Sequence, residues 1–104
     1  MESHGFCTFP SRGSRGIDVL CVHRETRQVV AAEIGGASKV ISTAFAKMRE
    51  AAVPVGTLYV VAKRVTRRDG ASSERTRWTF YGGSVDGRST TLEAALSVAL
   101  RDAT

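Results

Sequence analysis

Two acidic residues in neighbouring apolar stretches form the first candidate for chemistry. Asp18 begins one stretch rich in β-branched residues, and Glu33 lies near the end of the next. A turn centred between Glu25 and Thr26 would place Asp18 opposite Glu33, on the same face of an antiparallel strand pair. Two carboxylates on paired strands could hold a divalent cation such as Mg²⁺ for phosphoryl chemistry. Alternatively, both are sheet-rim carboxylates paired with Arg15 or another basic neighbour.

The order Asp, hairpin, Glu, helix, strand over about residues 17–65 resembles the catalytic core of the PD-(D/E)xK nucleases, which include the archaeal junction resolvases. In that family a lysine follows the second acidic residue by two positions, whereas this chain has Gly35 there. Lys39, at the start of the next predicted helix, could substitute for that lysine. The family's helix before the first strand would have to come from residues 1–16. The resemblance implies a metal-dependent nuclease with Asp18, Glu33 and Lys39 in its active site.

A second candidate site consists of two histidines and two cysteines with spacings that could ligate zinc. His4 and Cys7 form H-x₂-C, and Cys21 and His23 form C-x-H on one side of a predicted strand. The alternative is that Cys21 is a small core residue and that His23 caps the end of the strand. With two cysteines and no leader segment, we expect a reducing, cytoplasmic setting, which disfavours a disulfide between Cys7 and Cys21.

A third pattern is the concentration of positive charge between residues 63 and 77. Six basic residues face two acidic ones there, a balance of +4 out of the chain's net +5. Guanidinium groups match phosphate geometry, and flat aromatic rings can stack on exposed bases. A solvated hairpin that resists aggregation would explain the same charges without a ligand. The predicted nucleic-acid-binding residues are Lys63, Arg64, Arg67, Arg68, Arg75 and Arg77, with Tyr59 and Tyr81 as stacking surfaces.

The elements that would position these residues follow from hydrophobic periodicity. Residues 1–16 are predicted to be a flexible basic segment, followed by a single α+β domain over residues 17–104. Its half-units, 17–52 and 57–103, each give two strands and an amphipathic helix. We therefore expect a repeated ββα unit, forming a four-stranded, largely antiparallel sheet with both helices packed on one face.

Strand alternation predicts what each face of this sheet carries. Trp78 and Phe80 would lie under the helices, which leaves the basic residues and tyrosines of the second half on the open face. In the first half, that open face would carry an apolar group seeking cover, so we expect a homodimer. The apolar group comprises Leu20, Val22, Val29 and Ala31.

Composition and motifs restrict the remaining function classes. The chain has 104 residues, 42% of them hydrophobic, and no apolar run approaches the ~20 residues of a membrane span. Phosphate-loop and dinucleotide motifs are absent from the sequence, so no cofactor is expected. The sequence favours a small, basic, non-catalytic nucleic-acid-binding or regulatory protein that contacts phosphates through the 63–77 hairpin, with DNA and RNA not distinguished. The alternatives are a protein-interaction module using the apolar strand face, or a divergent PD-(D/E)xK-like nuclease.

Overall fold

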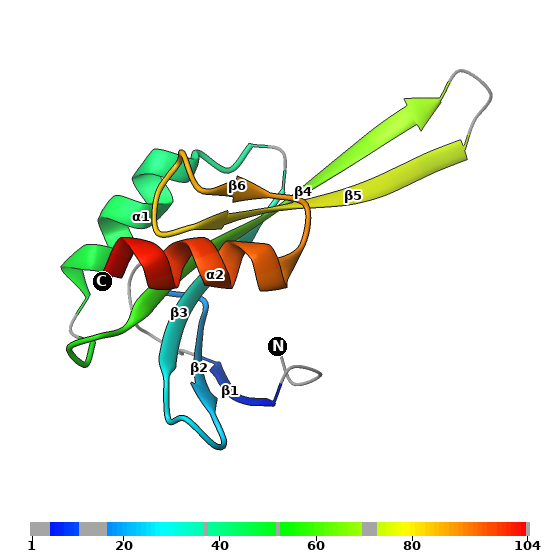
Figure 1. The fold of residues 1–104 in the computed structure, drawn as a ribbon. Coiled ribbons are helices and arrows are strands. Elements are labelled where there is room, and N and C mark those ends of the chain that lie inside the picture. The colour runs from blue at the N-terminus through cyan, green and yellow to red at the C-terminus, as the bar shows by residue number, and fades with distance from the viewer. Residues whose placement is uncertain (1–4, 11–16, 37, 52, 70–72, 104) are drawn as a thin grey trace.

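Six strands form one mixed sheet, and two helices accompany it. The computed structural model describes residues 5–10, 17–36, 38–51, 53–69 and 73–103, with the backbone alone at positions 10, 67–69, 73–76 and 102–103. The strands lie side by side in chain order, and α1 follows the third strand while α2 follows the sixth (Figure 1). Their bounds are β1 Phe6–Pro10, β2 Val19–His23, β3 Val29–Gly35, α1 Ile41–Glu50, β4 Leu58–Asp69, β5 Ser73–Gly82, β6 Arg88–Ser89 and α2 Leu92–Ala103.

The strands β3 and β4 form the one parallel pair of this sheet, and the other neighbours are antiparallel. Parallel neighbours need a crossover connection, which α1 provides. In β2 and β3, Val19 pairs with Ala32. This is the register expected from a turn centred between Glu25 and Thr26, so that expectation is confirmed.

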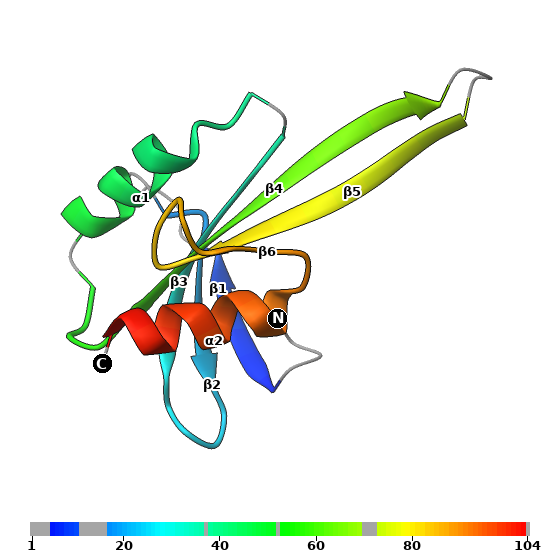
Figure 2. The same ribbon diagram turned by 45° about the horizontal axis from the view of Figure 1, so that its top comes forward.

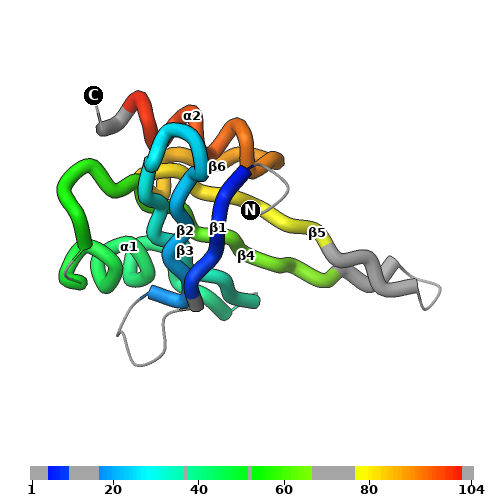
Figure 3. The backbone as a smooth tube through the Cα atoms, turned by 90° about the horizontal axis from the view of Figure 1, so that it is seen from below, coloured from blue at the N-terminus to red at the C-terminus, as the bar shows by residue number. Residues whose placement is uncertain are grey.

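The two helices cover opposite faces of the sheet (Figure 3). Ala31 and Val61 are buried on the α1 side, against the cluster that includes Phe45. Val30 and Val60 are buried on the α2 side. The central strand β3 is therefore covered on both faces, which explains its run of consecutive apolar residues. The expectation that both helices share one face was wrong, because it assumed a two-layer sheet with one face in water.

The fold is α+β, but the sheet has six strands and not four. The extra strands are β1, within the segment expected to be irregular, and the two-residue β6. The expected ββα repeat is not shown, since three strands precede α1 and three more precede α2. Both additions are edge strands, whose pairing is set by neighbours more than by their own hydrophobic pattern.

The outer halves of β4 and β5 extend past both helices as a two-stranded arm (Figures 1 and 2). We use "arm" for residues 63–69 and 73–79. It gives the molecule extents of 48 × 26 × 26 Å. Within the residues that the structure describes, neither helix is long and apolar enough to cross a membrane.

Candidate active site

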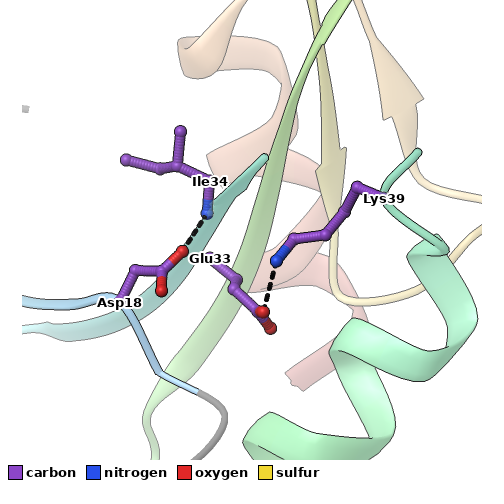
Figure 4. Close-up of polar contacts among 4 residues, drawn as sticks. All are labelled: Asp18, Glu33, Ile34 and Lys39. Carbon is purple, nitrogen blue, oxygen red and sulfur yellow. Dashed lines mark hydrogen bonds and ion pairs between the residues drawn. The ribbon is translucent and has the colours of Figure 1, made fainter. Parts of the chain in front are cut away.

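Asp18 and Glu33 lie at the point where β2 begins and β3 ends. The backbone N–H of Asp18 donates to the carbonyl of Ala32 at 3.1 Å, directly before the first register pair of the two strands, Val19 with Ala32, and so holds Asp18 next to the end of β3. The Oδ2 atom of Asp18 accepts a hydrogen bond from the backbone N–H of Ile34 at 2.7 Å (Figure 4). This bond fixes the exposed Asp18 carboxylate beside the end of β3.

Lys39 approaches the same place from the loop before α1. Its Nζ forms an ion pair with the Oε1 atom of Glu33 (Figure 4). A Cβ atom added at Gly35 would lie 2.7 Å from Cε and 2.9 Å from Cδ of Lys39. The side chain of Lys39 therefore occupies the space that a side chain at position 35 would need. The structure thus brings together the three residues that the sequence analysis named for a nuclease site.

The carboxylate of Glu33 is buried and only partly satisfied. The residue is 8% exposed, and its Oε2 has no hydrogen-bond partner among the described residues. Leaving a charged oxygen buried without a partner is costly. The ion pair with Lys39 offsets this cost at one oxygen and leaves the other without a hydrogen-bond partner among the described residues.

A pocket of about 290 Å³ adjoins this carboxylate on the α1 side of the sheet. Two ammonium groups and two hydroxyl groups line the pocket together with the carboxylate of Glu33. This lining could bind an anion, such as a phosphate, together with a cation next to the carboxylate. Among the described residues, the first turn of α1 holds no acidic residue and no side chain caps its N-terminus, so its polarity also favours an anion there. The polar lining residues are Glu33, Ser38, Lys39, Thr43 and Lys47.

The donor set fits a hard divalent cation. Mg²⁺ is commonly held by one or two carboxylates, with water and phosphate oxygens at the other positions. Asp18 and Glu33 supply such carboxylates on adjacent strands, and the unpartnered Oε2 of Glu33 is a buried oxygen that such a cation would satisfy. Glu33, Asp18 and Lys39 are therefore the residues that could hold a metal and balance the charge of a bound phosphate.

The arm begins next to this site. On β4, Val61 pairs with Glu33 and lies on the α1 side of the sheet. Lys63 pairs with Gly35 and lies on the same side, because it is two residues farther along the strand. Arg77 is exposed. It lies on the same side of the sheet, because its partner Val65 is two residues beyond Lys63. Arg64 is exposed on the opposite side. The side chains of Arg67, Arg68 and Arg75 lie outside the described residues, while their backbone continues the β4–β5 ladder.

The expected aromatic surface is placed differently. Tyr59 and Tyr81 are partly buried against the core under α1, and the guanidinium carbon of Arg49 lies 5.4 Å from the ring centroid of Tyr59. Trp78, expected under the helices, is 41% exposed. Both expectations were wrong for one reason: a helix covers each face near the centre of the sheet, and neither helix reaches the arm.

The zinc hypothesis is not supported by the geometry. Cys7 pairs with Val22, so it lies on the face opposite Cys21. The Nδ1 of His23 accepts the backbone N–H groups of Glu25 and Thr26, both at 3.2 Å, and so caps the turn after β2. Burial raises the pKa of the Cys21 thiol above its ordinary value, which opposes the thiolate that zinc requires.

In the described part of the chain, no three His, Cys, Asp or Glu side chains gather around one metal position. His4 lies outside the described residues. Both cysteines are free, as expected, because their positions on opposite faces keep the two thiols apart.

The apolar surface expected on the first hairpin is largely covered. Ala31 is fully buried, and Leu20 packs against the cluster under α1. The surface argument for a homodimer therefore does not hold, and the homodimer itself stays a prediction. Val22 and Val29 are partly exposed, and the protein-interaction alternative likewise stays a prediction.

Comparisons with protein-family models, with curated proteins and with solved structures found no match for this chain. The residues that sequence reasoning missed are the pocket residues Ser38, Thr43 and Lys47, and Trp78. Helical spacing of Thr43 and Lys47, four residues apart after Lys39, was the available signal for the pocket. For Trp78, the long basic run on both strands could have indicated a hairpin too long for any helix to cover.

Proposed function

We propose that this protein binds nucleic acid and hydrolyses its phosphodiester bonds at Asp18, Glu33 and Lys39 with a divalent cation. The observation that carries the proposal is the side chain of Lys39, which fills the space above Gly35 and contacts Glu33. The sequence departs from the nuclease pattern in two ways: position 35 lacks lysine, and only residues 1–16 were available for the family's first helix. A lysine that reaches the same space from position 39 answers the first point, while residues 6–10 form the strand β1 where the resemblance implies a helix.

Each of the three residues has a separate task in this proposal. Asp18 and Glu33 would hold the cation, and the hydrogen bond from Ile34 N–H keeps Asp18 oriented toward the end of β3. When bound, Mg²⁺ polarises a phosphoryl oxygen and makes its bound water a better nucleophile. The ammonium of Lys39 would stabilise the negative charge that develops on the phosphoryl oxygens. Lys47 and Thr43 line the pocket where the adjacent phosphate oxygens would bind.

The charge of the arm supports a polyanionic substrate. Lys63 lies beside the candidate site and Arg77 follows it on the same side, so phosphates between the cleaved bond and the arm would meet cations. Binding that relies on phosphate contacts releases counterions and weakens steeply with salt. We therefore expect affinity to fall by more than tenfold between 50 and 200 mM salt.

The test is cleavage of labelled single-stranded, duplex and branched DNA and RNA, with Mg²⁺ or Mn²⁺ and with chelator. Glu33→Gln and Asp18→Asn each remove a carboxylate charge and should lower the cleavage rate by about 100-fold or more. Glu25→Gln changes an exposed carboxylate in the β2–β3 turn and is the matched control, with wild-type activity expected.

Binding measured in parallel separates the two nucleic-acid functions. Glu33→Gln should still bind the substrate with an affinity near that of the wild type, because phosphate contacts on the arm remain. A wild-type protein that binds but never cleaves, in any of these metals, would support the non-catalytic binding function instead. Absence of binding at 50 mM salt would contradict both.

A further inference from the structure

An aromatic strip runs from the base of the arm onto the arm, on the side away from the candidate active site. Trp78 is 41% exposed, and its ring stacks with Phe80 at a centroid distance of 6.4 Å and an interplanar angle of 17°. The guanidinium carbon of Arg64, the register partner of Trp78, lies 6.0 Å from the Trp78 ring centroid. We define the aromatic strip as Arg64, Trp78 and Phe80.

No helix covers the outer part of this strip. The contact of α2 with β5 is at Gly82, where an added Cβ would lie 1.9 Å from the Ala95 carbonyl oxygen. Phe80 is two residues farther out and pairs with Ser89 of β6, and Trp78 is two residues beyond that. Trp78 therefore belongs to the arm, the part of β4 and β5 that projects past the helices (Figure 2).

An exposed tryptophan is out of place in a solvated, charged hairpin. A hairpin that merely resists aggregation requires charges and gains nothing from an exposed indole. Arg64 already holds the ring by a cation–π contact, which reduces the ordering cost when a flat ligand stacks on it. The strip thus offers a π-surface and a cation at the same place.

These observations identify the chemistry of the ligand. The residues between 63 and 77 carry a balance of +4, which complements a polyanion. A polyanion with flat aromatic faces is a nucleic acid, and its base faces are accessible where bases are unpaired. In a duplex these faces are stacked on each other, and the indole would meet the sugar–phosphate backbone instead.

We infer that the aromatic strip stacks on unpaired nucleobases, so that the arm directs the protein to single-stranded nucleic acid or to single-stranded segments of a larger substrate. The inference rests on the proposed nucleic-acid function and specifies its substrate. The two sides of the arm would then bind different parts of the nucleic acid. Basic side chains on the α1 side would bind phosphates near the active site, and the aromatic strip on the other side would bind a base.

The first measurement uses the protein's single tryptophan as the probe. Wild-type protein is titrated with a poly-deoxythymidine oligonucleotide and with a duplex of equal length, with chelator present to prevent cleavage. Stacking of a base on Trp78 should quench its emission during the single-strand titration. The duplex should bind, as followed by the anisotropy of a label on the DNA, with little quenching.

The second measurement compares variants by the same anisotropy. Trp78→Ala should weaken single-strand binding about tenfold, because one base–aromatic stack is lost, and should leave duplex affinity within about twofold. Trp78→Phe should retain most of the single-strand affinity. Phe9→Ala is the matched control, since Phe9 is an aromatic of β1 that is 55% exposed outside the arm, and it should change neither affinity.

The outcomes separate the inference from the proposed function. Binding of single strands without quenching, or equal losses for single strand and duplex in Trp78→Ala, would overturn the aromatic strip as a base-binding site while leaving nucleic-acid binding intact. Failure to bind any nucleic acid would overturn both. If Trp78→Ala instead abolished a concentration-dependent dimer seen by sedimentation and left DNA affinity unchanged, the strip would be a contact between copies and the inference would be wrong.

Discussion

Strands β3 and β5 each end at the first glycine of a Gly-Gly pair, Gly35-Gly36 and Gly82-Gly83, and the space above that first glycine is filled in different ways. Above Gly82 lies backbone: an added Cβ would come within 1.9 Å of the Ala95 carbonyl oxygen in α2. Above Gly35 lies the far end of a flexible side chain, the Cε and Cδ of Lys39. One glycine lets a helix approach a strand, and the other lets an ammonium group reach a buried carboxylate.

The difference shows that the Gly-Gly pairs are not one repeated feature. Gly82 serves the stability of the α2 side, where a helix backbone and a strand are in contact. Gly35 serves the candidate site, because it leaves room for Lys39 next to Glu33. A substitution at Gly82 should therefore affect folding, and a substitution at Gly35 should affect chemistry.

The largest expected effect is that of Gly82→Ala on stability. The new methyl group would collide with helix backbone, which cannot move without separating α2 from β5, so we expect a loss of about 3 kcal/mol or more in the free energy of unfolding. Urea unfolding followed by circular dichroism measures it. Gly36→Ala, with open space around the position, is the control and should change stability by less than about 0.5 kcal/mol. A Gly82→Ala protein as stable as the wild type would contradict this account of the α2 contact.

The next effect concerns the position from which the lysine acts. Lys39→Ala should lower the cleavage rate by about 100-fold, because the charge beside the phosphate is lost. Adding Gly35→Lys to Lys39→Ala returns an ammonium group to the same space from the strand, and should restore the rate at least tenfold. Steady-state cleavage assays on the two variants measure the recovery. A folded double variant no more active than Lys39→Ala would show that the space above Gly35 is not where the charge acts.

A smaller effect is expected for Gly35→Ala alone. The far end of Lys39 can move to admit one methyl group, but its Cβ, 3.0 Å from the new methyl, must also shift slightly, so stability should fall by about 1 kcal/mol. Displacement of the ammonium should nevertheless lower the cleavage rate about tenfold. Thermal unfolding and cleavage of the same preparation separate the two quantities. If stability fell as much as in Gly82→Ala while the rate was unchanged, the contrast between the two glycines would be refuted.

Much of the element order could be predicted from the sequence, because β2, β3, α1, β4, β5 and α2 each bury a periodic set of apolar residues. The register of β2 against β3 followed from counting residues across one turn. The parallel pairing of β3 and β4 did not follow, since alternation along a strand is the same in either direction. The burial of Glu33 was equally hidden, because it depends on which face α1 covers.

The sequence identified individual residues of the candidate site, but it did not predict how they are arranged in space. Lys39 could be named as a substitute for the absent lysine, yet its position above Gly35 depends on the path of the loop before α1. Trp78 was misplaced because alternation predicts the side of a strand and does not predict where a helix stops. The length of the arm decides its exposure, and strand length is a property of the whole hairpin.

The location of the lone indole has a practical consequence for melting experiments. Trp78 stands outside both helical layers and packs on Phe80 and Arg64, so its emission reports the pairing of the arm strands and not the interior. A fluorescence melt would therefore follow the arm, and its transition need not coincide with that of the body. Tyr59, held between the sheet and Arg49, is the aromatic whose near-ultraviolet signal would report the interior.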